Sequence, residues 1–245
     1  MLKVKNIKKS FGGVKAINGC SFEVKKGTIT ALIGPNGSGK STVFGIISGI
    51  EKEDEGKVVF GKKDITKARP EYISNAGISR LFQHSNLFNN LTVRENLLLG
   101  INTEDTKFWK NFLGFNKTTD EQEKKVKEIL KTVDMESYEN TKSKNLSYGQ
   151  KRLVELARAI IKPHQFLMLD EPVAGVNPNM REKIIKILRD LKKRNETILL
   201  IEHDMNFTLR IADRIIVLEK GKVIATGDPQ KIRNDKRVLD AYLGE

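Results

Sequence analysis

Short apolar runs recur along the chain, and each run is followed directly by polar residues. The clearest runs span residues 29–33, 166–169 and 197–201, and a weaker run spans residues 78–82. Runs of four or five apolar, often β-branched residues predict buried strands. The residues that follow these runs are Gly34, Asp170 with Glu171, Glu202 with His203, and Gln83.

Segments between the runs have helical spacing. Apolar residues fall at i, i+3, i+4 and i+7 in two places: Val126, Ile129, Leu130 and Val133, and Ile184, Ile187, Leu188 and Leu191. Buried strands that alternate with amphipathic helices predict a largely parallel sheet. Ligands of such sheets bind beyond the carboxyl ends of the strands, so we expect the polar residues after the runs to converge there.

A further amphipathic helix is predicted after the stretch LSYGQ at residues 146–150. Its apolar stripe contains Leu153, Leu156, Ala157, Ile160 and Ile161, whereas Arg152, Glu155 and Arg158 lie off the stripe. Ser147 and Gln150 have the spacing of a capping box. A serine hydroxyl and a glycine at a helix N-terminus also suit an anion, and the two interpretations are compatible.

The first run leads into a glycine-rich loop that fits a phosphate-binding motif. Residues 34–41 read GPNGSGKS and match the pattern G-x-x-x-x-G-K-[ST]. Glycines let the backbone direct its N–H groups at phosphate oxygens, and the helix predicted over residues 42–50 adds a positive dipole. Lys40 suits the β- and γ-phosphates, and the Ser41 hydroxyl suits Mg²⁺. The motif indicates nucleoside triphosphate binding, but it leaves open kinases, GTPases, helicases and transport ATPases.

The composition fits a globular protein with a core of its own. The 245 residues suffice for one large domain or two small ones, and 38% are hydrophobic. No apolar stretch approaches the ~18 residues that span a bilayer, and the N-terminal MLKVKNIKKS lacks the apolar region of a signal peptide. Cys20 is the only cysteine, which excludes an internal disulfide and makes the cytoplasm the expected compartment.

The formal net charge of +13 allows several partners but selects none of them. Nucleic acid, an anionic membrane or an anionic ligand would suit it, as would a solvated lysine-rich surface. The lysines are spread along the chain, and neither zinc-finger spacing nor an aromatic RNA-binding motif accompanies them. We therefore expect no nucleic-acid partner.

The predicted strand ends carry the groups that triphosphate hydrolysis needs. Asp170 suits the Mg²⁺ shell, and Glu171 suits a general base that polarises the attacking water. Gln83 suits a bridge between metal and water, and His203 suits a hydrogen bond to the γ-phosphate. The structural alternatives are a surface carboxylate for Glu171, a strand-end cap for His203 and a loop residue for Gln83.

Taken in order, these motifs resemble those of the ATP-binding-cassette (ABC) ATPases over essentially the whole chain. The resemblance begins with an aromatic residue, which stacks on adenine in the family. It continues with the phosphate loop at residues 34–42. It continues with the glutamine loop and the signature segment, residues 146–150. The stretch FLMLDEP at 166–172, the turn AGVNP at 174–178 and the histidine complete the set. The single residues concerned are Phe11, Gln83 and His203.

The resemblance implies a P-loop NTPase (RecA-like) α/β core with a mainly parallel sheet, an N-terminal antiparallel β subdomain and an inserted helical subdomain. It implies a single ABC ATPase domain over residues 1–245, with the core at 1–84 and 162–245 and the helical signature subdomain at 85–161. ATP and Mg²⁺ are the implied cofactors. The implied catalytic residues are Lys40, Gln83, Glu171 and His203, and the implied metal ligands are Ser41, Gln83 and Asp170. The implied nucleotide contacts are Phe11, Asn36, Gly37, Ser38, Gly39, Lys40, Ser41, Thr42, Ser147, Gly149 and Gln150.

Two residues depart from the family pattern. Tyr148 replaces the first glycine of the common signature LSGGQ, whereas Gly149 is kept. Asn177 stands where many members carry aspartate, which puts that loop's contacts across a dimer in question.

One branch of the family is most similar in detail. Residues 77–100, 170–178 and 201–205 and the C-terminal AYLGE look like those of the ATPases of branched-chain amino acid importers. Urea-importer and lipopolysaccharide-export ATPases are similar at the same positions, and a soluble, permease-free ABC ATPase is a further alternative. A non-enzymatic nucleotide-binding scaffold is disfavoured because Lys40, Asp170, Glu171 and His203 are intact.

The resemblance also implies partners and a location. Two cassettes would meet head to tail, as a homo- or heterodimer, with each ATP between one phosphate loop and the other chain's signature segment. Membrane permease subunits, and through them a substrate-binding protein, would place the chain at the inner face of the cell membrane. Leu87, Phe88 and Leu91 are candidates for the permease groove. The aromatic residues at 108–115 are interpreted as an amphipathic insertion or as a contact with the permease or membrane.

Overall fold

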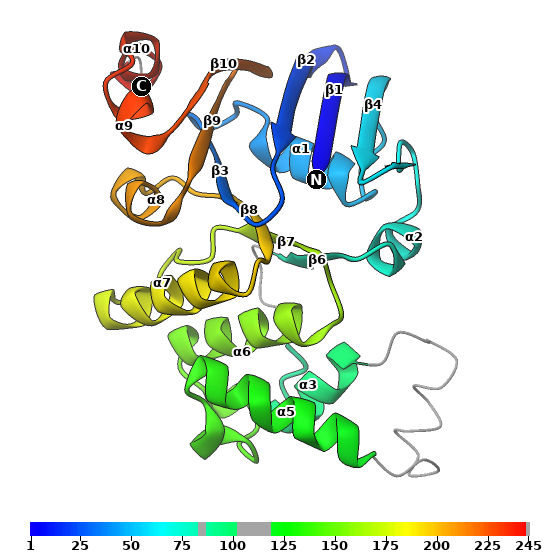
Figure 1. Cartoon of the computed structure of the whole chain (residues 1–245), viewed down its shortest axis with the longest axis vertical. Helices are drawn as coiled ribbons and strands as arrows, with labels where there is room; N and C mark the ends of the chain where they lie inside the picture. The colour runs from blue at the N-terminus through cyan, green and yellow to red at the C-terminus, as the bar shows by residue number, and fades with distance from the viewer. Residues whose placement is uncertain (83–86, 102–118, 244–245) are drawn as a thin grey trace. The chain divides into compact units, whose positions relative to one another are not determined.

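The computed structural model describes residues 1–82, 87–101 and 119–243 (Figure 1). The chain divides into two compact units. The first contains Met1–Arg80, Gln165–Glu171 and Arg189–Glu245, and the second contains Leu81–His164 and Pro172–Leu188. The chain therefore passes repeatedly from one unit to the other, and each unit is built from segments that are distant in the sequence.

A six-stranded sheet forms the centre of the first unit. Its strand order is β10-β9-β3-β8-β7-β6, from Lys222–Gly227, Arg214–Glu219, Ile29–Ile33, Thr197–Ile201, Phe166–Asp170 and Ile78–Leu81. Strand β8 is parallel to β7 and to β3, β3 is parallel to β9, and β10 runs antiparallel to β9. Every residue of β3, β7 and β8 is buried, as expected for strands covered on both faces. The predicted strands and the predicted α/β fold class are confirmed.

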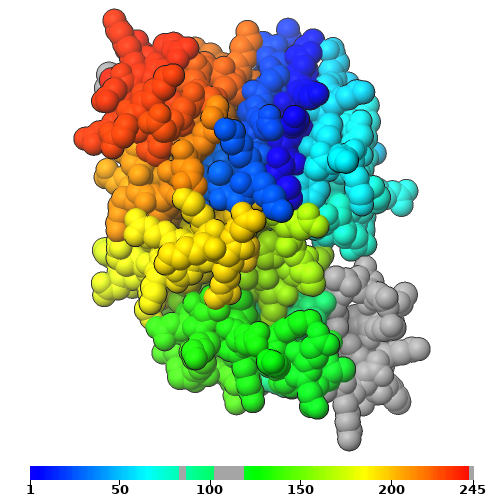
Figure 2. Space-filling view, viewed as in Figure 1, coloured from blue at the N-terminus to red at the C-terminus, as the bar shows by residue number. Residues whose placement is uncertain are grey.

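A second, antiparallel sheet is built from the N-terminal part of the chain. Its order is β2-β1-β4-β5, from Val14–Val24, Leu2–Phe11, Glu55–Phe60 and Lys63–Asp64. In the space-filling view, the blue and cyan surfaces of β1, β2 and β4 lie side by side (Figure 2). The ring of Phe60 packs edge-on against that of Phe166 in β7, with 5.8 Å between centroids, so the two sheets share a hydrophobic core.

The helices of the first unit are short. They are α1 (Lys40–Ile47), α2 (Pro70–Asn75), α8 (Met205–Ile211), α9 (Pro229–Arg233) and α10 (Lys236–Leu243). The helix predicted over residues 42–50 is thus shifted. It begins at Lys40 because Gly39, with φ of 103°, forms its N-cap, and it ends before Gly49, with φ of 75°.

The second unit is helical. It contains α3 (Val93–Ile101), α5 (Asp120–Val133), α6 (Tyr148–Ile161) and the 3₁₀ turns η1 (Glu136–Tyr138) and η2 (Ser143–Asn145). Helix α7 (Pro178–Lys193) begins in this unit and ends in the first. The predicted apolar stripes of α5 and α7 are both buried, which confirms the helical spacing: Val126, Ile129, Leu130 and Val133, and Ile184, Ile187, Leu188 and Leu191.

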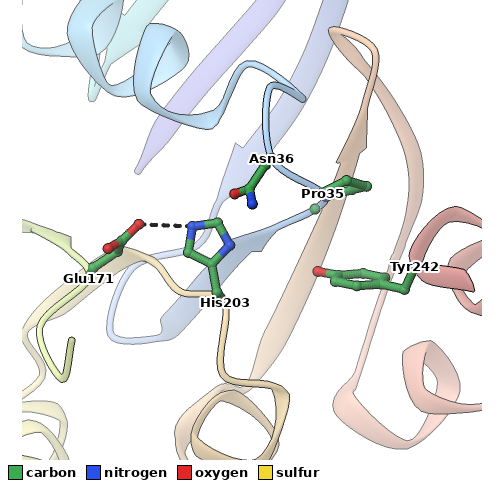
Figure 3. A pocket seen from close by; sticks show the side chains of 6 residues that line it. Pro35, Asn36, Glu171, His203 and Tyr242 are labelled. Carbon is green, nitrogen blue, oxygen red and sulfur yellow. Dashed lines mark ion pairs between the residues drawn. The ribbon is translucent and has the colours of Figure 1, made fainter. Parts of the chain in front are cut away.

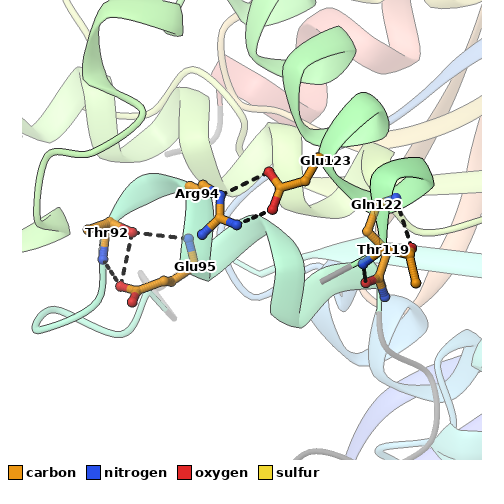
Figure 4. A network of polar contacts seen from close by, with 6 residues as sticks. All are labelled: Thr92, Arg94, Glu95, Thr119, Gln122 and Glu123. Atoms are coloured by element: carbon orange, nitrogen blue, oxygen red, sulfur yellow. Dashed lines mark hydrogen bonds and ion pairs between the residues drawn. The ribbon is translucent and has the colours of Figure 1, made fainter. Parts of the chain in front are cut away.

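Polar side chains define how α3 and α5 begin (Figure 4). Thr92 and Glu95 cap one helix reciprocally, with Thr92 N donating to Glu95 Oε2 at 2.7 Å, and Thr119 and Gln122 form the matching box on α5. The Arg94 guanidinium donates to both carboxylate oxygens of Glu123 and so joins the two helices. The predicted aromatic insertion at 108–115 lies outside the described residues.

Candidate nucleotide site

The phosphate loop connects β3 to α1 and folds around its own lysine. Lys40 is 5% exposed, and its Nζ donates to the carbonyl oxygens of Gly34 at 2.8 Å and Pro35 at 2.7 Å. The Ser38 hydroxyl lies 3.5 Å from the same ammonium. These contacts come from within the loop, so the positive charge of Lys40 is held over the backbone that precedes α1.

Two glycines of the loop are required by close backbone approach. A Cβ atom on Gly34 would lie 2.0 Å from the carbonyl oxygen of Leu218, and φ of Gly34 is 152°. A Cβ atom on Gly39 would lie 2.6 Å from the carbonyl oxygen of Ala16. The loop thus packs against two neighbouring backbone segments of the same unit, and side chains at these positions would displace it.

The remaining predicted nucleotide contacts of the first unit differ in how accessible they are. Asn36, Gly37 and Ser41 are exposed, and Thr42 is half-buried. Phe11 is 45% exposed at the end of β1, where Lys9 Nζ lies 5.0 Å from its ring centroid. An exposed aromatic face can stack on a base, and a cation beside it is compatible with an anionic ligand.

Asp170 ends β7 in a buried ion pair. Its Oδ2 accepts a hydrogen bond from Arg80 Nη2 at 3.1 Å, and Arg80 Nη1 donates to the Ser48 hydroxyl at 2.7 Å. The Arg80 guanidinium also lies 5.7 Å from the Phe44 ring centroid. Burial lowers the pKa of Arg80, and the charge of Asp170 opposes that shift. The carboxylate is therefore oriented by an arginine at the tip of the strand.

Glu171 and His203 meet at the ends of the neighbouring strands β7 and β8. His203 Nε2 lies 2.8 Å from Glu171 Oε1 (Figure 3). Glu171 N donates to the Ile201 carbonyl at 3.0 Å, which ties the start of the turn to β8. Glu171 has φ of 49°, a left-handed conformation that a residue with a Cβ adopts at a cost of about 1–2 kcal/mol. Strain of this kind persists where surrounding contacts determine the backbone, often at functional sites.

A pocket of about 510 Å³ lies between the phosphate loop and the Glu171–His203 pair. It is lined by Gly34, Pro35, Asn36, Glu171, His203 and Tyr242. The structure thus brings together the phosphate loop, Glu171 and His203, as the strand pattern predicts. Tyr242 extends from α10 into the same pocket (Figure 3), and no sequence signal that we considered assigned it there.

The signature segment begins α6 in the second unit. Gln150 N donates to the Ser147 hydroxyl at 3.3 Å, and Ser147 N donates to Gln150 Oε1 at 2.9 Å, so the predicted capping box is confirmed. Ser147 is exposed, and Tyr148 is 55% exposed. A Cβ atom on Gly149 would lie 3.2 Å from the Met180 side chain.

Asn177 caps the helix that follows the AGVNP turn. Its Oδ1 accepts a hydrogen bond from Met180 N at 2.9 Å at the start of α7. Asparagine performs this capping as well as aspartate does, so the substitution leaves the local structure satisfied. The ring of Tyr148 lies next to Gly175 of the same turn, because a Cβ atom on that glycine would approach Tyr148 Cε1 to 3.1 Å.

Two charged residues of α6 are buried, although they lie off its apolar stripe. Arg152 and Glu155, off the predicted stripe, are 3% and 8% exposed, and Arg152 Nη1 donates to Glu155 Oε2 at 3.0 Å. Burial is possible because the guanidinium has further acceptors in distant segments, which spacing along one helix does not reveal.

Three further observations concern Gln83, metal binding and membrane spans. Gln83, the predicted bridge between metal and water, lies outside the described residues. Within the described ranges, no cluster of three or more His, Cys, Asp or Glu side chains is arranged to hold a metal by itself. In the same ranges, no helix combines the length and apolar character that a membrane span requires.

Comparison with known proteins decides the family. The family model described as ABC transporter matches residues 17–174, more than half of the chain. The chain belongs to the ABC transporter family. A second model, described as branched-chain amino acid ATP-binding cassette transporter, matches residues 222–245, which include α10 and Tyr242.

Relatives within the ABC family match over the full length. A probable branched-chain amino acid transport ATP-binding protein LivG from Archaeoglobus fulgidus is 39% identical, over 100% of this chain and 95% of the relative. An ATP-binding cassette of an ABC transporter in its ADP conformation is 37% identical, with a TM-score of 0.86, over 100% of this chain and 99% of the other. A cassette seen as a dimer in a post-hydrolysis state with ADP and Pi is 27% identical, with a TM-score of 0.78, over 94% and 99%.

Proposed function

We propose that the chain is the ATP-hydrolysing subunit of an importer for branched-chain amino acids. It is an ATPase of the ABC class, and it binds adenine nucleotides, as its family does. The amino acid cargo is supported by the full-length similarity to the LivG protein and by the family match at residues 222–245. The Glu171–His203 pair beside the phosphate loop is the observation that carries hydrolysis.

Glu171 acts as the general base. It accepts a proton from the attacking water, whose oxygen bonds to the γ-phosphorus while the bond to the ADP oxygen breaks. As a base, Glu171 accepts hydrogen bonds, so His203 Nε2–H donates to it, and this bond orients the imidazole. With ATP bound, His203 donates to a γ-phosphate oxygen and stabilises the developing charge.

The phosphate loop binds the triphosphate. Lys40 exchanges its contacts with the loop carbonyls for β- and γ-phosphate oxygens, and the N–H groups at the start of α1 complete the cradle. Residues 36–42 line this cradle, and Phe11 stacks on the adenine.

The oxygen donors of the site fit Mg²⁺. Ser41 offers an exposed hydroxyl, and Asp170 offers a carboxylate that Arg80 orients. In triphosphate sites Mg²⁺ takes only one or two ligands from the protein, because waters and phosphate oxygens fill the rest of its coordination shell. The ion would be held by Ser41 and, through water, by Asp170, with Gln83 as a further ligand, and it would neutralise phosphate charge.

Two cassettes close around each ATP. In this arrangement Ser147, Gly149 and Gln150 of one chain contact the γ-phosphate held by the partner chain. Their position at a helix N-terminus, where Ser147 is exposed and Gly149 and Gln150 are half-buried, supports this role, as does the dimeric cassette among the structural relatives. Loss of the γ-phosphate removes these contacts and lets the dimer open.

The chain works at the inner face of the cell membrane, as a single ABC ATPase domain bound to permease subunits. Its predicted parts are the core at 1–84 and 162–245 and the helical subdomain at 85–161. Of the candidate groove residues, Phe88 is 50% exposed and suits a permease contact, whereas Leu87 is buried. A substrate-binding protein delivers the cargo to the permease.

The substitution Glu171→Gln tests the hydrolytic role. The variant keeps the side-chain size and the approach of His203, so we expect ATP to bind and an ATP-dependent dimer to accumulate while turnover falls at least about a hundredfold. Turnover is measured by phosphate release, and dimer formation by light scattering after gel filtration. Wild-type turnover in this variant would remove Glu171 from its role.

Uptake experiments test the cargo. The chain is reconstituted with its permease and binding protein in vesicles, and uptake of labelled leucine is compared with uptake of labelled urea. We expect ATP-dependent leucine uptake. Urea uptake in its place would overturn the proposed cargo and leave the ATPase assignment intact.

A further inference from the structure

The signature helix α6 contains a buried arginine whose contacts reach two distant segments. Arg152 Nη1 donates to the Phe82 carbonyl at 2.9 Å, and Arg152 Nε donates to the Pro172 carbonyl at 3.3 Å. The charge is matched by Glu155, one turn further along the helix. A planar guanidinium can hold several acceptors in one fixed geometry, which a lysine ammonium cannot reproduce.

Both carbonyl groups lie just after a point where the chain enters the second unit. The chain passes from the first unit to the second between Arg80 and Leu81, and again between Glu171 and Pro172. Phe82 and Pro172 are therefore the second and the first residues after these crossings. Arg152 fastens both incoming segments to the helix that begins with Ser147.

The second of these contacts adjoins the strained residue of the site. Glu171 has φ of 49° and precedes a proline, whose ring restricts the backbone of the preceding residue. Its own N–H is held by the Ile201 carbonyl at 3.0 Å. The carbonyl of the next residue is held by Arg152, so the turn is fixed from both sides, as a strained backbone requires.

We propose that Arg152 is a positioning residue for ATP hydrolysis: its hydrogen bond to the Pro172 carbonyl fixes the backbone next to Glu171, and its hydrogen bond to the Phe82 carbonyl holds the guanidinium in that geometry. The inference rests on the proposed role of Glu171. Arg152 acts on hydrolysis through the turn at Glu171–Pro172. Displacement of that turn by a fraction of an ångström would misplace the base and slow the chemical step.

The test compares two substitutions in the same buried pair. Arg152→Lys keeps a positive charge opposite Glu155 but loses the planar fork, so we expect kcat to fall about tenfold to a hundredfold while KM for ATP changes less than about threefold. Glu155→Gln keeps the guanidinium and its two carbonyl contacts, so we expect a lower Tm with kcat within about twofold of wild type. Unchanged kcat in Arg152→Lys would overturn the proposal.

A second background separates positioning of Glu171 from other effects of the signature helix. In Glu171→Gln, adding Arg152→Lys should leave the ATP-dependent dimer unchanged, because the base is already lost. Loss of that dimer in the double variant would show that Arg152 acts on cassette association, and it would overturn the proposal.

If Arg152→Lys does not fold, the neutral pair Arg152→Gln with Glu155→Gln replaces it and should show the same reduction of kcat. Absence of ATPase activity in the unaltered chain would refute the proposed function itself.

Discussion

The phosphate loop and the signature segment are both expected to meet ATP, but their polar groups are held differently. The loop buries Lys40 beneath carbonyl groups, and its glycines press against the backbone of Leu218 and Ala16. In the signature segment Ser147 and Tyr148 are exposed, and the polar side chains of Ser147 and Gln150 satisfy a helix N-terminus. The conformation of the phosphate loop is thus fixed by packing within the first unit, whereas the signature segment presents capped polar groups at its surface.

Because of this difference, tolerance to substitution should be unequal in the two regions. A change in the loop disturbs backbone packing and is felt in folding. A change in the signature segment disturbs a cap at the surface, so it should be felt mainly in contact with a partner.

The largest effect is expected from the matched substitutions Gly34→Ala and Gly149→Ala. In Gly34→Ala, the added Cβ atom would lie 2.0 Å from a backbone oxygen, and the free energy of unfolding should fall by about 3 kcal/mol or more. In Gly149→Ala, the nearest atom belongs to the flexible Met180 side chain, and alanine favours the helix, so the change should stay within about 1 kcal/mol. Urea unfolding measures both. Equal losses of unfolding free energy in the two variants would contradict this difference between the regions.

The next effect concerns nucleotide affinity. Lys40→Ala removes the charge that the loop holds, and we expect the Kd for ATP to rise about tenfold to a hundredfold, with ATPase activity lost. Calorimetric titration measures the affinity. The control Lys3→Ala removes an exposed lysine of β1 and should leave the affinity unchanged. Equal affinities of Lys40→Ala and wild type would contradict the assignment of the loop.

A small effect on stability is expected at Ser147. Ser147→Ala removes the N-cap and should lower the free energy of unfolding by about 1 kcal/mol. Ser147→Asp keeps the cap and should be as stable as wild type, but its negative charge would repel a phosphate. We therefore expect turnover to rank wild type, Ser147→Ala, Ser147→Asp. If turnover followed stability across the three proteins, capping alone would explain Ser147.

The sheet and the meeting of Glu171 with His203 were predictable from the sequence. Continuous apolar runs define strands that are buried on both faces, and β3 and β8 end where their runs end, whereas β7 extends one residue further, to Asp170. Because these strands are parallel neighbours, the polar residues after them lie at one edge. The two residues that follow each run therefore carry most of the information about the site.

The contacts of Arg152 and the place of Tyr242 were not predictable in this way. A charged residue off an apolar stripe is normally solvated, and the acceptors that make burial possible for Arg152 lie 70 residues before it and 20 residues after it. Tyr242 reaches the pocket from α10, after an antiparallel strand at the edge of the sheet. Both depend on the packing of distant segments, which local periodicity does not encode. The predicted roles of the site residues stay predictions, including that of Gln83.

The left-handed backbone at residue 171 has a consequence for protein engineering. Glycine and asparagine adopt this conformation more easily than glutamate, so a search for stabilising substitutions would be drawn to this position. A redesigned chain with glycine there would resist heat better and would lack the carboxylate beside His203. Melting temperature is therefore a misleading guide when improved cassettes of this kind are selected, and libraries should exclude residue 171.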